Sequence, residues 1–266
     1  MIAVEAVDVV KRFRSVDGSE LTVLNGVDLQ VDRGEMVAVV GASGAGKSTL
    51  LQILGALDPP TSGLVMIGGV RLDAPSRSPT PGQPDRGPSA FARFGRLMMD
   101  GARRRHEFRR DEELSHLRNR SIGFVFQFHH LLREFSALEN VMMPLLLAQW
   151  DRERARARAD ELLGRIGLEN RRHHRPAELS GGEQQRTAVA RALAGGPAVL
   201  LADEPSGNLD HANSERLHDL FVDVARDFNV AMVIATHNRL LANRADRVLS
   251  LEDGKLQDAN VREVVP

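Results

Sequence analysis

Polar and hydrophobic positions alternate in the N-terminal part of the chain, as they do in β-strands with one buried face. The alternation runs through Val4, Ala6 and Val9, and it returns at Val27–Val31 after a polar turn at Asp17-Gly18. The sequence therefore predicts short β-strands joined by turns at the N-terminus.

Further along, apolar runs of strand length alternate with segments of helical spacing. The apolar runs are Met36–Val40, Ile122–Phe126, Val199–Ala202 and Val230–Ala235, and the helical segments are Lys47–Leu57, Asp151–Leu168 and Ser214–Phe228. Strands that alternate with helices are typical of an α/β protein. The pattern therefore predicts a mostly parallel sheet, and we see no internal repeat.

The segment after Asp73 differs in composition from the rest. Prolines are interleaved with Ser, Gly and Arg over Asp73–Pro88, which indicates a flexible loop. Ala90–Leu117 has helical spacing and is strongly basic, with Phe91 and Phe94 on its apolar face. This half could lie on anionic lipid headgroups or pack as a solvated helix on the surface of its own domain.

The composition restricts the possible classes of protein further. The 266 residues are 42% hydrophobic and 27% charged, as in ordinary globular proteins, and the net charge of −1 predicts no binding to nucleic acid. The absence of cysteine excludes disulfides and thiolate metal sites. No apolar run approaches the ~20 residues of a membrane span, and no signal peptide is visible. We therefore expect a soluble protein whose membrane role, if any, depends on a partner.

A glycine-rich stretch follows the strand Met36–Val40 and precedes a helix, and it matches the P-loop pattern GxxxxGK[ST]. Its residues are Gly41, Ala42, Ser43, Gly44, Ala45, Gly46, Lys47 and Ser48, and Thr49 follows in the helix. The backbone N–H groups and the helix N-terminus should bind phosphates. Lys47 should reach the β- and γ-phosphates and Ser48 should ligate Mg²⁺, which indicates a nucleotide such as ATP.

Two adjacent acids end the apolar strand Val199–Ala202. Asp203 at the strand tip can belong to the magnesium shell, while Glu204 can act on the attacking water as a general base. An Asp-Glu pair at a strand end is common in isolation. Its combination with a P-loop favours the catalytic interpretation.

The stretch Leu179–Arg186 resembles the signature motif of ABC transporter ATP-binding subunits, a family of ATPases. Ser180, Gly181, Gly182 and Glu183 would open a helix whose N-terminus faces phosphate. In the family that phosphate belongs to ATP held by the opposite subunit. The resemblance therefore implies that a second copy of the chain completes the active site.

The resemblance extends to four further positions. Phe13 matches the aromatic residue that stacks on adenine, where Tyr is more usual, although a lone Phe could equally be a core residue. Gln127 matches the glutamine that contacts magnesium and the water. Ser206–Asp210 matches the dimer-contact loop, and His237 matches the histidine that contacts the γ-phosphate.

The implied fold is an α/β P-loop NTPase. A RecA-like, mostly parallel sheet would form the core, with an N-terminal antiparallel β-subdomain and an α-helical signature subdomain. The expected ABC ATPase domain covers residues 1–257, with the helical subdomain at about 128–180 and a tail at 258–266. The Pro-rich and basic segment 74–110 is longer than the family pattern at this position and interrupts the resemblance.

The sequence after Gln127 indicates one branch of the family. Phe126–Val141 contains Phe-His-His-Leu-Leu and Ala-Leu-Glu-Asn-Val, which closely resembles the ATPase of lipoprotein-releasing systems, although Arg133 replaces a frequent proline. The implied location is the cytoplasmic face of the bacterial inner membrane, under integral membrane permease subunits. The alternatives are the ATPases of macrolide or peptide exporters and of the cell-division complex. An ABC protein of DNA repair or ribosomes is a further rival, but no coiled-coil insertion or second ATPase unit is visible.

Two pairs of adjacent histidines need a separate interpretation. His129-His130 and His173-His174 could each suggest a metal, but no third ligand lies at a suitable spacing. We expect these histidines to be groove or surface residues.

Overall fold

The computed structural model describes residues 1–14, 18–72, 115 and 117–259. A four-stranded antiparallel sheet has the strand order β2-β1-β4-β5. Its strands are β1 (Ile2–Arg14), β2 (Glu20–Asp32), β4 (Ser62–Ile67) and β5 (Val70–Leu72). Side chains of β1 and β2 such as Val4, Val9 and Val27 are fully buried, because the alternation directs them to one face. The predicted N-terminal strands are confirmed, but β1 and β2 are longer than the short strands expected.

The second sheet has six strands in the order β10-β9-β3-β8-β7-β6. Its strands are β3 (Met36–Val40), β6 (Ile122–Phe126), β7 (Val199–Asp203), β8 (Ala231–Ala235), β9 (Arg247–Glu252) and β10 (Lys255–Asp258). Every neighbouring pair is parallel except β9 with β10. Each residue of β3 and β8 is buried, which explains why these strands are unbroken apolar runs. The prediction of a mostly parallel sheet is confirmed.

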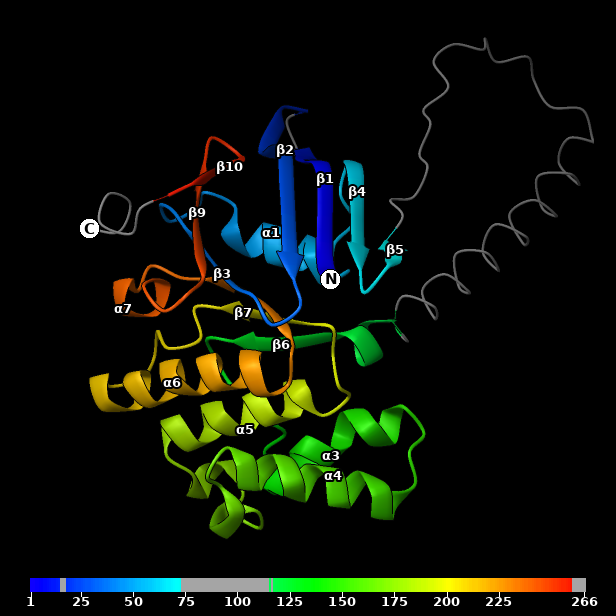
Figure 1. Cartoon of the computed structure of the whole chain (residues 1–266), viewed down its shortest axis with the longest axis vertical. Helices are drawn as coiled ribbons and strands as arrows, with labels where there is room; N and C mark the ends of the chain where they lie inside the picture. Colours follow the sequence, from blue (N-terminus) through cyan, green and yellow to red (C-terminus); the bar gives the residue numbers. More distant parts are fainter. Residues whose placement is uncertain (15–17, 73–114, 116, 260–266) are drawn as a thin grey trace, which may run out of the picture.

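Helices cover both faces of the six-stranded sheet (Figure 1). Helix α1 lies between the two sheets, and its Leu50, Ile53 and Leu54 belong to the core that the sheets share. The opposite face is covered by a helical layer that forms a second core with it. The helices are α1 (Lys47–Leu54), α3 (Ala137–Leu147), α4 (Arg152–Arg165), α5 (Gly181–Leu193), α6 (His211–Asp227) and α7 (Arg239–Ala242), with 3₁₀ turns at Glu169–Arg171 and Pro176–Glu178.

The predicted bounds of three helices were wrong. The helix expected over Asp151–Leu168 is α4, which begins at Arg152 and ends at Arg165. The helix expected over Lys47–Leu57 ends at Leu54, and Gly55 lies against the ring of Phe124, where a Cβ would come within 1.8 Å of the ring. The helix expected over Ser214–Phe228 begins at His211 instead, because Asp210 accepts a hydrogen bond from the Asn213 N–H and caps it. The local cap therefore sets the start of α6, and the Phe124 ring requires glycine just beyond the end of α1.

Helix α3 was not predicted, because its apolar residues and its internal Pro144 obscure the helical pattern. A capping box begins it: the Ser136 side chain accepts from the Glu139 N–H at 3.3 Å, and Glu139 accepts from the Ser136 N–H at 2.8 Å. The S-x-x-E spacing was a usable signal for this helix.

Several sequence expectations lie outside the described residues. These are the Pro-rich loop Asp73–Pro88, nearly all of the basic helix Ala90–Leu117, and the tail beyond residue 259. Asp258, expected to start the tail, pairs with Leu249 as the last residue of β10. In the part of the chain that is described, no helix is both long and apolar enough to cross a membrane.

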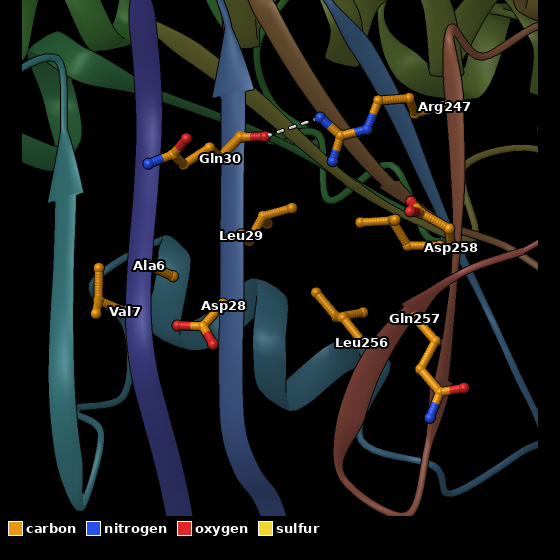
Figure 2. Close-up of a pocket in the computed structure, with 10 residues that line it drawn as sticks. Ala6, Val7, Asp28, Leu29, Gln30, Arg247, Leu256, Gln257 and Asp258 are labelled. Atoms are coloured by element: carbon orange, nitrogen blue, oxygen red, sulfur yellow. Dashed lines mark hydrogen bonds between the residues drawn. The ribbon is translucent and has the colours of Figure 1, made fainter.

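A hollow of about 420 Å³ opens between β1 and β2 on one side and β9 and β10 on the other (Figure 2). Leu29 and Leu256 line it, and Arg247 crosses it to donate to the backbone oxygen of Gln30 at 3.3 Å. Arg247 pairs with Val37 near the start of β3, whereas the P-loop follows the end of β3. The hollow is therefore separate from the phosphate-binding loop.

Candidate active site

Neighbouring parallel strands end together at one edge of the six-stranded sheet, and the candidate residues follow those ends. In the pairing register, Phe126 lies beside Asp203, Asp203 beside Ala235, and Ala235 beside Val39. The loops that follow carry Gln127, Glu204, His237 and the P-loop. Because the carboxyl ends of parallel strands share an edge, the sheet brings together residues that are far apart in sequence.

The backbone of the P-loop requires glycine at two of its turns. Gly41 has φ 145°, and a Cβ there would lie 2.7 Å from the backbone oxygen of Leu251. Gly46 has φ 105° and precedes α1 without any side-chain cap on the first N–H groups of the helix. Uncapped N–H groups at a helix N-terminus favour a bound anion, which suits the phosphates of a nucleotide.

Lys47, the first residue of α1, folds back over the P-loop. Its Nζ donates to the backbone oxygens of Gly41 at 2.8 Å and Ala42 at 3.0 Å. Hydrogen bonds from an ammonium to phosphate oxygens are stronger than those to neutral carbonyls. The lysine is therefore held where it can exchange loop carbonyls for the phosphates of a nucleotide.

Ser48 and Asp203 form the part of the site that suits a divalent cation. Burial at the end of β7 raises the pKa of Asp203 and the negative charge of Glu204 raises it further, while a hydrogen bond from Ser48 and the charge of Lys47 lower it. Oxygen ligands from a carboxylate, a hydroxyl and an amide are those that Mg²⁺ prefers. Gln127 follows Phe126, which lies beside Asp203 in the register, and can supply the amide oxygen.

Glu204 is the most constrained residue of the site. Its φ of 45° is in the left-handed region, which is rare for a residue other than glycine and common at functional sites. Its Oε1 lies 2.8 Å from His237 Nδ1, and its Oε2 accepts from the Thr236 hydroxyl and the His237 N–H, each at 3.3 Å. These contacts fix the direction of the carboxylate and join two of the predicted site residues.

Gln127 is connected to the loop that follows Glu204. Its Nε2 donates to Asn208 Oδ1 at 3.1 Å, and Asn208 Nδ2 donates to the backbone oxygen of Gln127 at 3.3 Å. Gly207 packs so closely that a Cβ there would lie 3.0 Å from Gln127 Nε2. Gln127, which is predicted to contact magnesium, and the predicted dimer-contact loop therefore form one hydrogen-bonded unit.

The predicted signature motif forms the N-terminus of α5, as expected. Glu183 accepts from the Ser180 N–H at 2.8 Å and from its hydroxyl at 2.9 Å, and Arg171 pairs with Glu183 at 2.9 Å. The backbone N–H of Ser180 and the charge of Arg171 contribute to lowering the pKa of Glu183 to about 2. Gly182 is required by packing, because a Cβ there would lie 2.4 Å from Asn213 Oδ1. Ser180 and Glu183 thus form the capping box that begins α5.

Two buried residues of the site were missed by sequence reasoning. Gln185 of α5 is fully buried and donates to the backbone oxygens of Phe126 at 3.0 Å and Pro205 at 2.7 Å. Thr236 is also fully buried and binds Glu204. Both lie inside motifs that the sequence showed, but their roles depend on contacts with distant residues.

The histidine pair His129-His130 follows Gln127 on the segment that precedes α3. Arg191 of α5 donates to the backbone oxygens of His130 at 2.7 Å and His129 at 2.9 Å. Burial lowers the pKa of His129, and the positive charge of Arg191 adds to this effect. These two hydrogen bonds therefore hold the segment against α5, the helix that begins at the signature motif.

Phe13 lies at the end of β1 and is 41% exposed, so the structure excludes a core position for it. Lys11 is buried below it, fixed by Asp58 at 2.6 Å and by the backbone oxygen of Pro59 at 2.7 Å. The Lys11 ammonium lies 5.0 Å from the centre of the Phe13 ring, within cation–π distance. The ring is thereby held with part of its surface free for a base.

Replacing Phe13 by alanine should weaken the binding of ATP by at least about fivefold, because stacking of one base on an aromatic ring contributes about 1–3 kcal/mol. Titration calorimetry with ATP measures the dissociation constant. Inorganic tripolyphosphate, which has no base, should bind the variant and the parent chain equally. Equal ATP affinity in Phe13→Ala would exclude the stacking role.

Comparison with known proteins agrees with the fold and the loops described above. The family model described as ABC transporter matches residues 24–207, and the chain belongs to this family of ATP-binding subunits. An ATP-binding cassette, MJ0796, solved as a dimer in a post-hydrolysis state with ADP and Pi, is 32% identical with a TM-score of 0.74. The superposition covers 97% of this chain and 99% of that one.

Two relatives with greater identity share one name. The lipoprotein-releasing system ATP-binding protein LolD of Bordetella pertussis is 48% identical over 239 residues, which cover 90% of this chain and 89% of the relative. The protein of the same name from Geobacter metallireducens is 47% identical over 252 residues, which cover 95% and 96%. The similarity therefore spans nearly the whole of each chain.

Proposed function

We propose that this chain is the ATP-hydrolysing subunit of a lipoprotein-releasing transporter at the cytoplasmic face of the bacterial inner membrane. The observation that carries this proposal is the 47–48% identity, over nearly the full length, to proteins named for that system. Two copies of the chain would act together under integral membrane permease subunits. The ATP-binding cassette solved as a dimer supports the pairing.

In the proposed mechanism, the P-loop and Lys47 bind the triphosphate and Phe13 binds the base. The fit of Mg²⁺ rests on the oxygen groups at the end of β7. Burial raises the pKa of Asp203 there, and a nearby positive charge would stabilise its ionised carboxylate. Ser48, Asp203 and Gln127 would hold this ion, which when bound neutralises phosphate charge.

Glu204 is proposed to orient the attacking water and accept its proton, and His237 to contact the γ-phosphate. The 2.8 Å contact between them supports these roles, because it aligns both side chains at the same point of the sheet edge. Ser180, Gly181 and Gly182 at the start of α5 would meet the phosphate bound by the second copy. Hydrolysis would then require both copies.

Purification of the tagged chain from the membranes of its own cells tests the transporter assignment. The chain should be extracted together with integral membrane subunits of the lipoprotein-releasing type, and depletion of the chain should leave lipoproteins in the inner membrane. Recovery of a cell-division membrane protein or of an exporter subunit, with lipoprotein sorting unchanged, would contradict lipoprotein release. ATP hydrolysis by the purified chain is measured separately.

A further inference from the structure

The loop 204–210 joins the candidate catalytic glutamate to α6, and side chains of other elements hold it in place. Gln185 of α5 donates to the backbone oxygen of Pro205, and Gln127 after β6 donates to Asn208. Both contacts come from motifs already assigned to the site. A third contact comes from the middle of α6, where the proposed function assigns no residue.

This third contact joins His218 of α6 to Ser206 of the loop. His218 Nε2 lies 3.1 Å from Ser206 Oγ, with the histidine fully buried and the serine 5% exposed. Ser206 is two residues beyond Glu204, and the Gly207 N–H donates to the backbone oxygen of Glu204 at 3.1 Å. A displacement of Ser206 would therefore move Glu204 as well.

The surroundings of His218 favour one direction of this hydrogen bond. Nδ1 lies 3.7 Å from Glu215 Oε1, and the nearby negative charge favours a proton on Nδ1. Arg244 holds Glu215 at 2.8 Å and also pairs with Asp219. Burial lowers the pKa of His218, and the charge of Arg244 lowers it further, against the opposite effects of Glu215 and Asp219. A neutral ring with its proton on Nδ1 would accept through Nε2 from the Ser206 hydroxyl.

The order Glu215, His218, Ser206 resembles an acid–base–nucleophile arrangement, but two observations exclude that chemistry. The serine hydroxyl is enclosed, so no substrate can reach it. The distance from Glu215 to His218 is too long for a hydrogen bond. The arrangement orients the loop without reacting.

We propose that His218 is a positioning residue for ATP hydrolysis, which acts through Ser206 to fix the loop 204–210 and the carboxylate of Glu204. This inference rests on the proposed ATPase function. The proposed nucleotide contacts come from the P-loop and Phe13, which lie outside this loop. Loss of the contact should therefore lower kcat and leave the KM for ATP unchanged, since small misplacements of catalytic groups reduce rate more than binding.

The test compares variants of the full-length chain in steady-state ATPase assays. His218→Phe, which fills the space without an acceptor, should lower kcat by about tenfold, the effect of one well-placed hydrogen bond. Ser206→Ala should do the same, and the double variant should be no slower than either single variant, because the two side chains act through one contact. His218→Gln can place an acceptor near the Nε2 position and should restore most of the rate.

Val224→Ala is the matched control for lost stability. Val224 is buried on the same helix and belongs to the core of the helical layer, so its truncation should lower Tm and leave kcat unchanged. An unchanged kcat in Ser206→Ala and His218→Phe would overturn the inference, and so would a fall in kcat in Val224→Ala as large as theirs. If the unaltered chain hydrolysed no ATP, the proposed function itself would fail, and the inference with it.

Discussion

Glu204→Gln is expected to reduce steady-state ATP hydrolysis by about 10²-fold or more, the usual contribution of a general base or water-orienting carboxylate. Glutamine retains the size of the side chain and one oxygen. Its amide NH₂ cannot accept a proton, and it replaces an oxygen that now accepts from Thr236 or lies against His237. Phosphate release at saturating ATP measures the change in kcat.

The same variant should still bind ATP, because in the described part of the chain the Glu204 carboxylate bonds to Thr236 and His237 and not to the P-loop. With hydrolysis blocked, ATP should hold two copies together, and size-exclusion chromatography with ATP should show a dimer. Glu161→Gln is the control, since Glu161 lies on α4 in ion pairs with Arg158 and Arg165. An unchanged kcat in Glu204→Gln would refute the catalytic assignment.

Lys47→Ala is expected to weaken ATP binding by at least about 30-fold, because truncating one partner of a hydrogen-bonded charge pair costs about 2 kcal/mol or more. The ammonium now donates to Gly41 and Ala42, so the phosphates would replace contacts that already orient it. Titration calorimetry gives the dissociation constant. Thermal unfolding gives an independent measure, because a ligand that binds only the folded state raises Tm.

Lys255→Ala removes the same charge from the exposed strand β10. It should change neither the dissociation constant for ATP nor the rise in Tm that ATP causes. This control separates the local contact from the general effect of net charge. If ATP raised the Tm of Lys47→Ala as much as that of the parent chain, the lysine would have no role in phosphate binding.

The fold was predictable where short stretches of sequence decide local structure. The unbroken apolar runs at Met36–Val40 and Ile122–Phe126 became strands of the stated length, since residues buried on both faces must all be apolar. The start of α5 at Ser180 was predictable because its cap is a contact between neighbours. The close approach of Phe124 to Gly55 at the end of α1 was not predictable, because it joins residues far apart in sequence.

The sequence by itself determined the chemical parts of the candidate site. A P-loop needs consecutive glycines and Lys47 in a fixed local order, and the acids of Asp203-Glu204 end a strand that its apolar residues define. The same holds for the cap that Ser180 and Glu183 form.

Only the tertiary structure decided how these parts act together. Gln185 reaches Phe126 and Pro205, and His218 reaches Ser206, across stretches of chain whose spacing carries no periodic signal. The exposure of Phe13, and its place beside the Lys11 ammonium, likewise came only from the tertiary structure. The physical reason is that strand order and register bring distant residues to one edge of the sheet, and no local pattern of residues encodes that order.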